Sequence, residues 1–249
     1  MIEIKSKDEI EKISRASQVV GKVLRQLQEI IEPGITTEAI DQTAEKLLHK
    51  FGAVSAFKGY SGYPANICTS INEEVVHGIP GKRRLNEGDI ISIDVGAKVD
   101  GYFGDAAFTF AIGNVSTVAK DLLAVTYESL QRGIKQARPG NHLSDISSAI
   151  QVYAESYDFS IVRKFVGHGI GSKLHEEPEI PNFGKPGIGP QLRVGMVLAI
   201  EPMVNQGSYE VEILEDKWTA VTKDRQLSAH FEHTICVTEG KPEILTAWE

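Results

Sequence analysis

One pattern occurs twice in this chain of 249 residues, and its repetition constrains the fold more than any other feature. The pattern Leu-x-x-Gly-x-x-x-x-Ile followed by an acidic residue spans 85–94 and again 192–201, an offset of 107 residues. A Pro-Gly pair at Pro33-Gly34 recurs at Pro139-Gly140, an offset of 106 residues. Repeats at a constant spacing indicate duplicated structural units. We therefore expect a chain built from two similar halves.

The first part of each half has the periodicity of helices. Apolar residues recur at spacings of three and four from Ile10 to Ile31, after a capping-box pattern formed by Ser6 and Glu9. The Pro-Gly pair after Ile31 would end this helix. By the same criteria, further helices are expected over about 37–51, 117–138 and 144–157.

Strand signals follow the helices in each half. In the first half, residues 89–95 and 102–110 are predicted to form a hairpin around an Asp-Gly turn. Residues 176–190 contain four prolines and three glycines, so this stretch is expected to be an irregular loop. The remaining strands of the second half are expected over 161–166, 194–201, 209–214, 218–222 and 228–238.

The repeated order of helix, helix and hairpin predicts an α+β fold. The half-repeats cover roughly residues 1–115 and 116–249, and each is too small to close a core of its own. We expect them to form a single domain over residues 1–249, with pseudo-twofold symmetry. A cleft between two such halves is a natural ligand site.

Composition excludes several classes of function. The 26 basic and 34 acidic residues give a net charge of −8, which argues against a general binder of nucleic acid or anionic membrane. No apolar run is long enough for a transmembrane helix, and no signal-peptide core begins the chain. Cys68 and Cys236 cannot form a disulfide framework and are expected to be reduced thiols of a cytoplasmic protein.

Carboxylates end the repeated strands at equivalent positions. Asp94 closes the apolar run of the first half and Glu201 closes that of the second. The returning strand of the first hairpin would bring Asp105 beside Asp94, and the last strand would bring Glu232 towards Glu201. His168 stands in a Gly-His-Gly-Ile-Gly segment, where glycines allow close backbone approach.

Four carboxylates in one cleft cannot all stay ionised unaided, because like charges and burial both raise their pKa values. Two divalent ions would neutralise them. An oxygen-rich ligand set with one imidazole suits ions such as Co, Mn, Fe, Zn or Ni better than Ca. Two such ions about 4 Å apart can clamp an electrophile, which predicts metal-assisted hydrolysis.

Three of these residues also have a plainer interpretation when taken alone. Asp94 could be a satisfied carboxylate at a turn, Asp105 a turn residue after a glycine, and Glu232 an edge-strand charge. His230 and His233 lack the intervening glutamate of a zinc-peptidase helix. The joint pattern favours the metal site over these separate interpretations.

The residues just described stand in a series of motifs that resembles the type I methionine aminopeptidases over nearly the full length of the chain. Each motif alone has little specificity, whereas the ordered set is highly specific. The matching motifs are Gly62-Tyr63-Pro64, Ile71-Asn72-Glu73-x-Val75-x-His77-Gly78-Ile79-Pro80, Gly88-Asp89-x-x-x-Ile93-Asp94-Val95, Gly104-Asp105, Val166-Gly167-His168-Gly169-Ile170-Gly171, His175-Glu176-Glu177-Pro178 and Ile200-Glu201-Pro202.

The resemblance implies the pita-bread fold, with two pseudo-twofold-related halves around a curved antiparallel sheet. It implies a dinuclear metallo-aminopeptidase that removes the N-terminal methionine from nascent proteins and peptides when the second residue is small. A bridging water would attack the scissile carbonyl. The family's metal ligands fall on Asp94, Asp105, His168, Glu201 and Glu232.

The resemblance also assigns roles. Asp105 and Glu232 would bridge the two ions, and Glu201 would act as general base. His175 would stabilise the oxyanion of the scissile carbonyl, and His77 would bind the scissile amide and assist the leaving amine. The methionine pocket would be formed by Tyr60, Tyr63, Cys68 and Trp218. Phe57 and Leu174 replace residues frequent in bacterial members and would alter the shape of this pocket.

Three other functions are compatible with parts of the sequence. A prolidase or aminopeptidase P relative usually carries an extra N-terminal domain, and a non-catalytic relative would have lost metal ligands. An RNA-associated module is disfavoured by the net charge, and Lys82-Arg83-Arg84 is interpreted as a solvated loop. The minimal bacterial form is expected, as a cytoplasmic monomer without membrane or stable nucleic-acid partners, whose contact with the ribosome would be transient at most.

Overall fold

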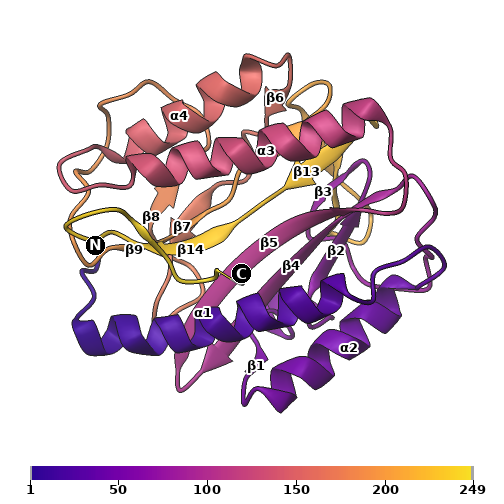
Figure 1. The fold of residues 1–249 in the computed structure, drawn as a ribbon, viewed down its shortest axis with the longest axis horizontal. Helices are drawn as coiled ribbons and strands as arrows, with labels where there is room; N and C mark the ends of the chain where they lie inside the picture. Colours follow the sequence, from indigo (N-terminus) through magenta and orange to yellow (C-terminus); the bar gives the residue numbers. More distant parts are fainter. Residues whose placement is uncertain (1, 248–249) are drawn as a thin grey trace.

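The four helices of the repeat are present in a computed structural model, which describes residues 2–247 (Figure 1). The first helix begins as its sequence predicts, because the Ser6 hydroxyl accepts from the Glu9 N–H and the Glu9 carboxylate accepts from the Ser6 N–H. The helices are α1 (Lys7–Gln28), α2 (Thr37–Lys50), α3 (Thr117–Gln136) and α4 (Leu143–Glu155).

Every strand pairing within residues 2–247 is antiparallel, and the strands form four small sheets. The predicted hairpin is the longest element of the first half. In that half, β4 (Ile90–Val99) pairs with β1 (Val54–Ser55), β2 (Cys68–Ile71) and β5 (Tyr102–Ala111). In the second, the order is β15 (Glu243–Ile244), β14 (His233–Cys236), β9 (Val197–Ile200), β7 (Gly167–Gly169) and β8 (Glu176–Ile180).

Two smaller sheets complete the strand layer. One has the order β13 (Ser228–His230), β10 (Met203–Asn205) and β6 (Ser160–Ile161). The other has the order β11 (Val211–Ile213), β12 (Ala220–Thr222) and β3 (Glu74–Val76), and so joins a strand of the first half to a hairpin of the second. A short 3-10 turn, η1 (Tyr60–Gly62), lies between β1 and β2.

Three expectations about strands were wrong. The stretch 176–190 is not wholly irregular, because β8 occupies its start and pairs with β7, with Pro178 and Ile180 buried. The strand expected over 161–166 ends at Ile161. The strand expected over 228–238 is interrupted at Phe231 and Glu232, because the β5 backbone replaces the ladder partner there: the Glu232 N–H donates to the Ala107 carbonyl at 2.8 Å.

The two halves meet where β5 runs beside β13 and β14. The Thr109 hydroxyl donates to the His230 carbonyl at 2.7 Å and accepts from the His230 N–H at 3.0 Å. These two hydrogen bonds and the one between Glu232 and Ala107 join the second half to the first along β5. This seam lies at the centre of the strand layer and positions the site described below.

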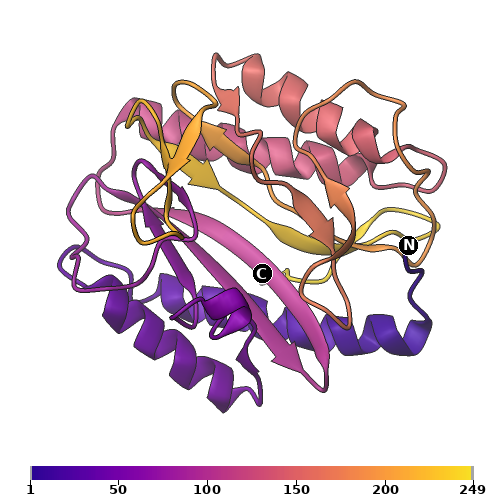
Figure 2. The same cartoon turned by 180° about the vertical axis from the view of Figure 1, so that it is seen from behind.

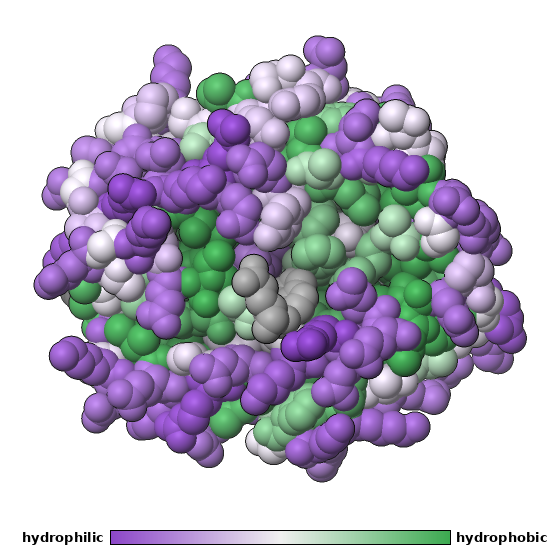
Figure 3. All heavy atoms as spheres, in the orientation of Figure 1, coloured by the Kyte–Doolittle hydropathy of each residue, from purple (hydrophilic) through white to green (hydrophobic). Residues whose placement is uncertain are grey.

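The helices cover one face of the strands, as the views from the front and from behind show (Figures 1 and 2). One apolar core forms mainly between α1, α2 and the first sheet, and another between α3, α4 and strands of the second half. On the helical face, charged and polar side chains cover the helices, and apolar side chains gather in the band between the two helix pairs (Figure 3). The α+β pita-bread arrangement predicted from the sequence is confirmed.

No helix within residues 2–247 combines the length and apolar character needed to span a bilayer. The division into half-repeats and the single catalytic domain remain predictions. The order of the helices and strands agrees with both.

Candidate metal and active site

The candidate site residues named from the sequence come together in one cavity of about 190 Å³. They come from both halves of the chain, and none of them lies outside this cavity. Phe57, Ser61 and Leu174 also line it. The sequence-derived members are Tyr60, Tyr63, Cys68, His77, Asp94, Asp105, His168, His175, Glu201, Trp218 and Glu232.

The hairpin of the first half sets the positions of Asp94 and Asp105. In the β4–β5 register, Asp94 stands opposite Ala107 and Asp105 stands opposite Gly96. Side chains two residues apart on a strand share a face, so both carboxylates point to the same side of the sheet. Cys68 on β2 lies directly across from Asp94, which brings the thiol to the same face.

The second half supplies the other candidate ligands from strand ends. His168 on β7 pairs with Ala199 on β9, and Glu201 follows the last residue of β9. Glu232 lies in the break between β13 and β14, where its N–H is bound to the first half. A strand that continued unbroken through Glu232 would lose this bond to Ala107. The break in the strand at Glu232, which the sequence did not predict, therefore helps to position the Glu232 side chain.

Three of these side chains form a compact group that could hold a metal ion. Ligand atoms of Asp105, His168 and Glu232 all lie within 4.8 Å of one another, and the three residues are buried. One carboxylate oxygen each of Asp94, Asp105 and Glu232 is buried without any hydrogen-bond partner. Buried polar atoms in native proteins are normally satisfied, so these orphaned oxygens indicate a missing cation.

No lysine or arginine within residues 2–247 pairs with the four carboxylates; the only ion-pair partners found are histidines facing Glu201. Burial raises the pKa of Asp94 to about 7. Burial and then the neighbouring carboxylates raise the pKa values of Asp105, Glu201 and Glu232 well above their usual range. Such a group stays ionised at neutral pH only if cations compensate its charge. The residues present therefore fit divalent metal ions.

His168 is oriented as a metal-binding imidazole. Its Nδ1 lies 2.9 Å from the Gly169 carbonyl, which requires a proton on Nδ1 and leaves the Nε2 lone pair free. Nε2 faces Glu201, with 3.5 Å between Nε2 and Oε1. Burial lowers the pKa of His168 to about 3, so the ring is neutral at physiological pH.

The two other predicted histidines lie beside this group. His77 follows β3 with a positive φ of 62°, and its ring packs edge-on against Phe165 at 5.4 Å between centroids. Burial lowers the pKa of His77 to about 4. The Nδ1 of His175 lies 2.7 Å from the Tyr60 hydroxyl, and the His175 ring is 4.3 Å from that of His168. Neither His77 nor His175 belongs to the compact ligand group.

An aromatic and thiol-lined recess occupies the rest of the cavity. The rings of Tyr63 and Trp218 meet edge-on with 5.1 Å between centroids, and Cys68 is buried beside them. The Tyr63 hydroxyl donates to the Gly78 carbonyl at 2.9 Å, which fixes its ring. Such walls suit an unbranched thioether side chain.

Sequence reasoning missed His230, which was considered only as part of a false zinc motif. Its side chain is 2% exposed, and its Nε2 lies 3.8 Å from Oε2 of Glu201. Glu201 therefore lies between two imidazoles, those of His168 and His230. The one signal available in the sequence was the position of His230, two residues before Glu232.

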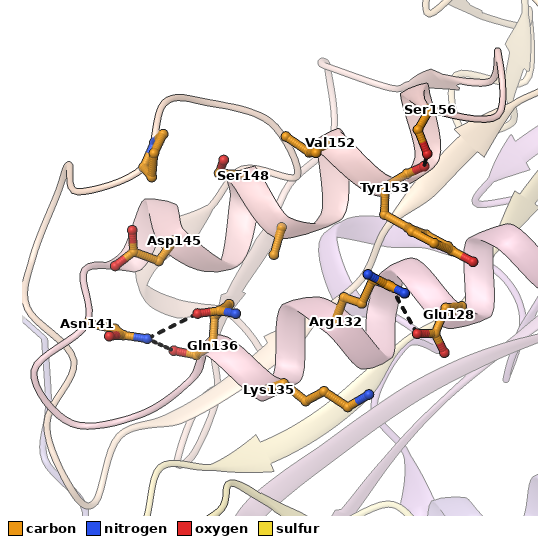
Figure 4. Close-up of a pocket in the computed structure, with 12 residues that line it drawn as sticks. Glu128, Arg132, Lys135, Gln136, Asn141, Asp145, Ser148, Val152, Tyr153 and Ser156 are labelled. Carbon is orange, nitrogen blue, oxygen red and sulfur yellow. Dashed lines mark hydrogen bonds and ion pairs between the residues drawn. The ribbon is translucent and has the colours of Figure 1, made fainter.

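A groove of larger volume lies elsewhere, between α3 and α4 (Figure 4). It measures about 900 Å³, and Arg132 in it is paired with Glu128 at 3.0 Å and stacks on Tyr153. No site residue named from the sequence faces this groove.

Two residues of the basic loop Lys82-Arg83-Arg84 make contacts within the chain. Arg83 is paired with Glu74, and Arg84 donates a hydrogen bond to the Gly34 carbonyl.

A pita-bread fold with acidic, metal-compatible side chains at its centre defines a metal-dependent hydrolase. The profile of metallopeptidase family M24 matches residues 11–239, and the chain belongs to this family. Within it, the chain groups with the type I methionine aminopeptidases, which are metallo-exopeptidases.

Individual relatives support this grouping. The chain is 53% identical over 250 residues to "Methionine aminopeptidase" of Clostridium acetobutylicum, with all of both chains covered. The crystal structure of a methionine aminopeptidase from Thermotoga maritima is 48% identical, with a TM-score of 0.98 over 99% of this chain and 100% of that one. A prolidase from Pyrococcus horikoshii shares the fold at 24% identity and a TM-score of 0.81, but only 64% of that chain is covered.

Proposed function

We propose that the protein removes an N-terminal methionine from peptides and nascent proteins, with two divalent ions held by Asp94, Asp105, His168, Glu201 and Glu232. The observation that carries the proposal is the set of buried carboxylate oxygens without partners beside a neutral imidazole. Four carboxylates carry four negative charges, which two dications would balance. Asp105 and Glu232, whose ligand atoms lie with that of His168 within 4.8 Å of one another, would be among the residues that hold the ions.

Bound ions of this class polarise a carbonyl and lower the pKa of water. Proton transfer, stabilisation of the oxyanion and binding of the scissile amide are carried out by side chains of the protein. Glu201 accepts a proton from the attacking water and returns it to the leaving amine. His175 donates a hydrogen bond to the carbonyl oxygen as negative charge develops there. His77 binds the nitrogen of the scissile amide.

Specificity follows from the recess beside these groups. Tyr60, Tyr63, Cys68 and Trp218 surround the space for an unbranched side chain, and a thioether makes favourable contacts with aromatic edges. A small second residue is preferred, as in the type I methionine aminopeptidases that the sequence resembles. The protein acts as a cytoplasmic monomer, and any ribosome contact is transient.

Turnover of methionyl peptides by metal-stripped protein, resupplied with one divalent ion at a time, tests the proposal. Met-Gly-Met is expected to be cleaved only after metal addition, and dipeptides with N-terminal proline are expected to be ignored. Preference for the proline substrates would favour a prolidase activity instead. Bound metal is measured at each step, and two equivalents per chain are expected at full activity.

Alanine variants test the ligand set. Asp105→Ala and Glu232→Ala should abolish turnover and lower the bound metal, because each removes a residue of the compact group that would hold metal. Glu210→Ala is a matched control, since this acid is exposed and paired only with Lys223. Full activity in either ligand variant would contradict the dinuclear site.

A further inference from the structure

The hydroxyl of Tyr60 makes one contact that its place in the pocket does not explain. Tyr60 begins the turn η1 of the first half, and the residue is 42% exposed at the rim of the cavity. Its oxygen lies 2.7 Å from Nδ1 of His175, which belongs to the second half. A contact of this length between a phenol and an imidazole nitrogen is a strong hydrogen bond. A residue that served only as a wall of the pocket would need the aromatic ring but not the hydroxyl.

The turn that carries Tyr60 is held firmly. The Tyr60 N–H donates to the Phe57 carbonyl at 2.8 Å, and the Tyr63 N–H donates to the Tyr60 carbonyl at 2.9 Å. Gly59 and Gly62 on either side have φ values of 86° and 88°, a region that favours glycine. The hydroxyl is therefore presented from a rigid backbone.

The partner ring is also fixed. His175 follows the buried Leu174 and precedes β8, and its ring is 4.3 Å from that of His168, edge to face. Glu176 anchors this loop through the Lys173 N–H at 3.0 Å and through the buried amine of Lys5. Two rigid segments from opposite halves thus meet at one hydrogen bond.

The direction of that bond decides which proton His175 can offer. A neutral imidazole carries a proton on only one of its two ring nitrogens. If the Tyr60 hydroxyl donates to Nδ1, the proton must reside on Nε2, where it can be donated to substrate. If Nδ1 carried the proton instead, Nε2 would present a lone pair to a developing oxyanion, and the contact would be repulsive.

We propose that Tyr60 is a positioning residue that holds His175 in the Nε2–H tautomer by donating its hydroxyl proton to Nδ1. This rests on the proposed function in one respect, the use of His175 as a hydrogen-bond donor to the scissile carbonyl. The hydrogen bond also connects the rim of the substrate pocket, where Tyr60 of the first half lies, to His175 of the second half. The role of Tyr60 is then separate from its role as a wall of the pocket.

The tautomer is measured directly by NMR of metal-free protein labelled with ¹⁵N-histidine. In the wild-type protein, Nδ1 of His175 should be unprotonated and Nε2 protonated. In Tyr60→Phe, which keeps the ring, the signals should move towards a mixture of tautomers. Tyr63→Phe is the matched control: its hydroxyl interacts with the Ile67 and Gly78 carbonyls and with the Cys68 thiol rather than with His175, so the His175 signals should not change. A wild-type spectrum with the proton on Nδ1 would overturn the proposal without any variant.

Kinetics give the second test. Tyr60→Phe should lower kcat by roughly tenfold with little change in KM, which is less than the 10²–10³-fold loss expected on removing an oxyanion donor outright. His175→Ala should show that larger loss, and adding Tyr60→Phe to it should have no further effect on kcat. If Tyr60→Phe lowered kcat by the same factor in the wild-type protein and in His175→Ala, Tyr60 would be shown to act independently of His175.

The two measurements separate this proposal from the proposed function. The NMR result needs no substrate and no metal. A correct tautomer in a protein that cleaves no methionyl peptide would refute the proposed activity and leave the proposed hydrogen bond standing. Unchanged spectra and unchanged kcat in Tyr60→Phe would refute the positioning role, whatever the substrate is.

Discussion

The main chain of Asp105 is bonded in both directions by one side chain, that of Thr234. The Asp105 N–H donates to the Thr234 hydroxyl at 3.1 Å, and this hydroxyl donates to the Asp105 carbonyl at 2.7 Å. Thr109 makes the same reciprocal pair with His230 four residues away, and Glu232 lies between the two pairs. Asp105 and Glu232 are thus brought together by the bonds that join the two halves.

Replacing Thr234 with valine should therefore weaken both the fold and the metal site. The variant keeps the shape and removes two buried hydrogen bonds, so we expect a loss of about 1–3 kcal/mol of unfolding free energy. Metal affinity should fall roughly 10–100-fold, as for other residues that orient ligands. Denaturant unfolding and calorimetric metal titration measure the two effects. Thr109→Val is the control: a similar loss of stability is expected with a smaller change in metal affinity.

Neutralising Asp105 should make the metal-free protein more stable. Asp105 is buried beside Asp94 and Glu232, whose charges raise its pKa, and its own charge raises the pKa of Glu201. Asp105→Asn should raise the unfolding free energy without metal by about 1–3 kcal/mol, since a buried group lacking partners is costly. The same variant should no longer be stabilised by added divalent ions. Thermal unfolding with and without chelator tests this, and a loss of stability in chelator would contradict the charge argument.

Stability of the metal-free protein should fall as pH rises above neutrality. The four carboxyls have raised pKa values in the folded state, so the folded protein binds more protons than the unfolded one up to about pH 7 for Asp94 and higher for the others. The buried histidines, with pKa values of about 3 to 4, act in the opposite direction, but only below about pH 6.5.

Above pH 6.5 only the carboxyl effect remains, and each group that titrates there contributes a slope of up to about 1.4 kcal/mol per pH unit. Unfolding of chelated protein between pH 6.5 and pH 9 measures this slope. Saturating metal should abolish it, because the ions replace the protons. A stability that rises with pH over this range in chelator would show that the carboxyls are already compensated.

Removing His77 should impair turnover without removing metal. His77 lies in the cavity but outside the compact group of ligand atoms. His77→Ala should lower kcat by roughly 10²-fold, the lower end for a group that assists proton transfer, with metal content unchanged. His168→Ala is the matched comparison and should lower both. Metal loss in His77→Ala would make His77 a ligand.

Much of the fold was predictable because it is encoded locally. The cap at Ser6, the apolar periodicity of α1 and the Asp-Gly turn of the β4–β5 hairpin act over a few residues, and all are present in the structure. The short strands were harder to predict. β8 has an irregular composition and is a strand because β7 supplies its partner, which no pattern within residues 176–180 could show.

The candidate site likewise has features that the sequence encodes locally and features that depend on contacts between distant segments. The sequence alone determined the residue types and their symmetric placement, since Asp94 and Glu201 end equivalent strands of a repeat. Tertiary structure decided which of these groups meet. The break at Glu232, the seam held by Thr109 and Thr234, the place of His230 beside Glu201 and the bond from Tyr60 to His175 all join segments far apart in the chain. Such contacts depend on how two halves pack against each other, and a local pattern has no information about its partner across the interface.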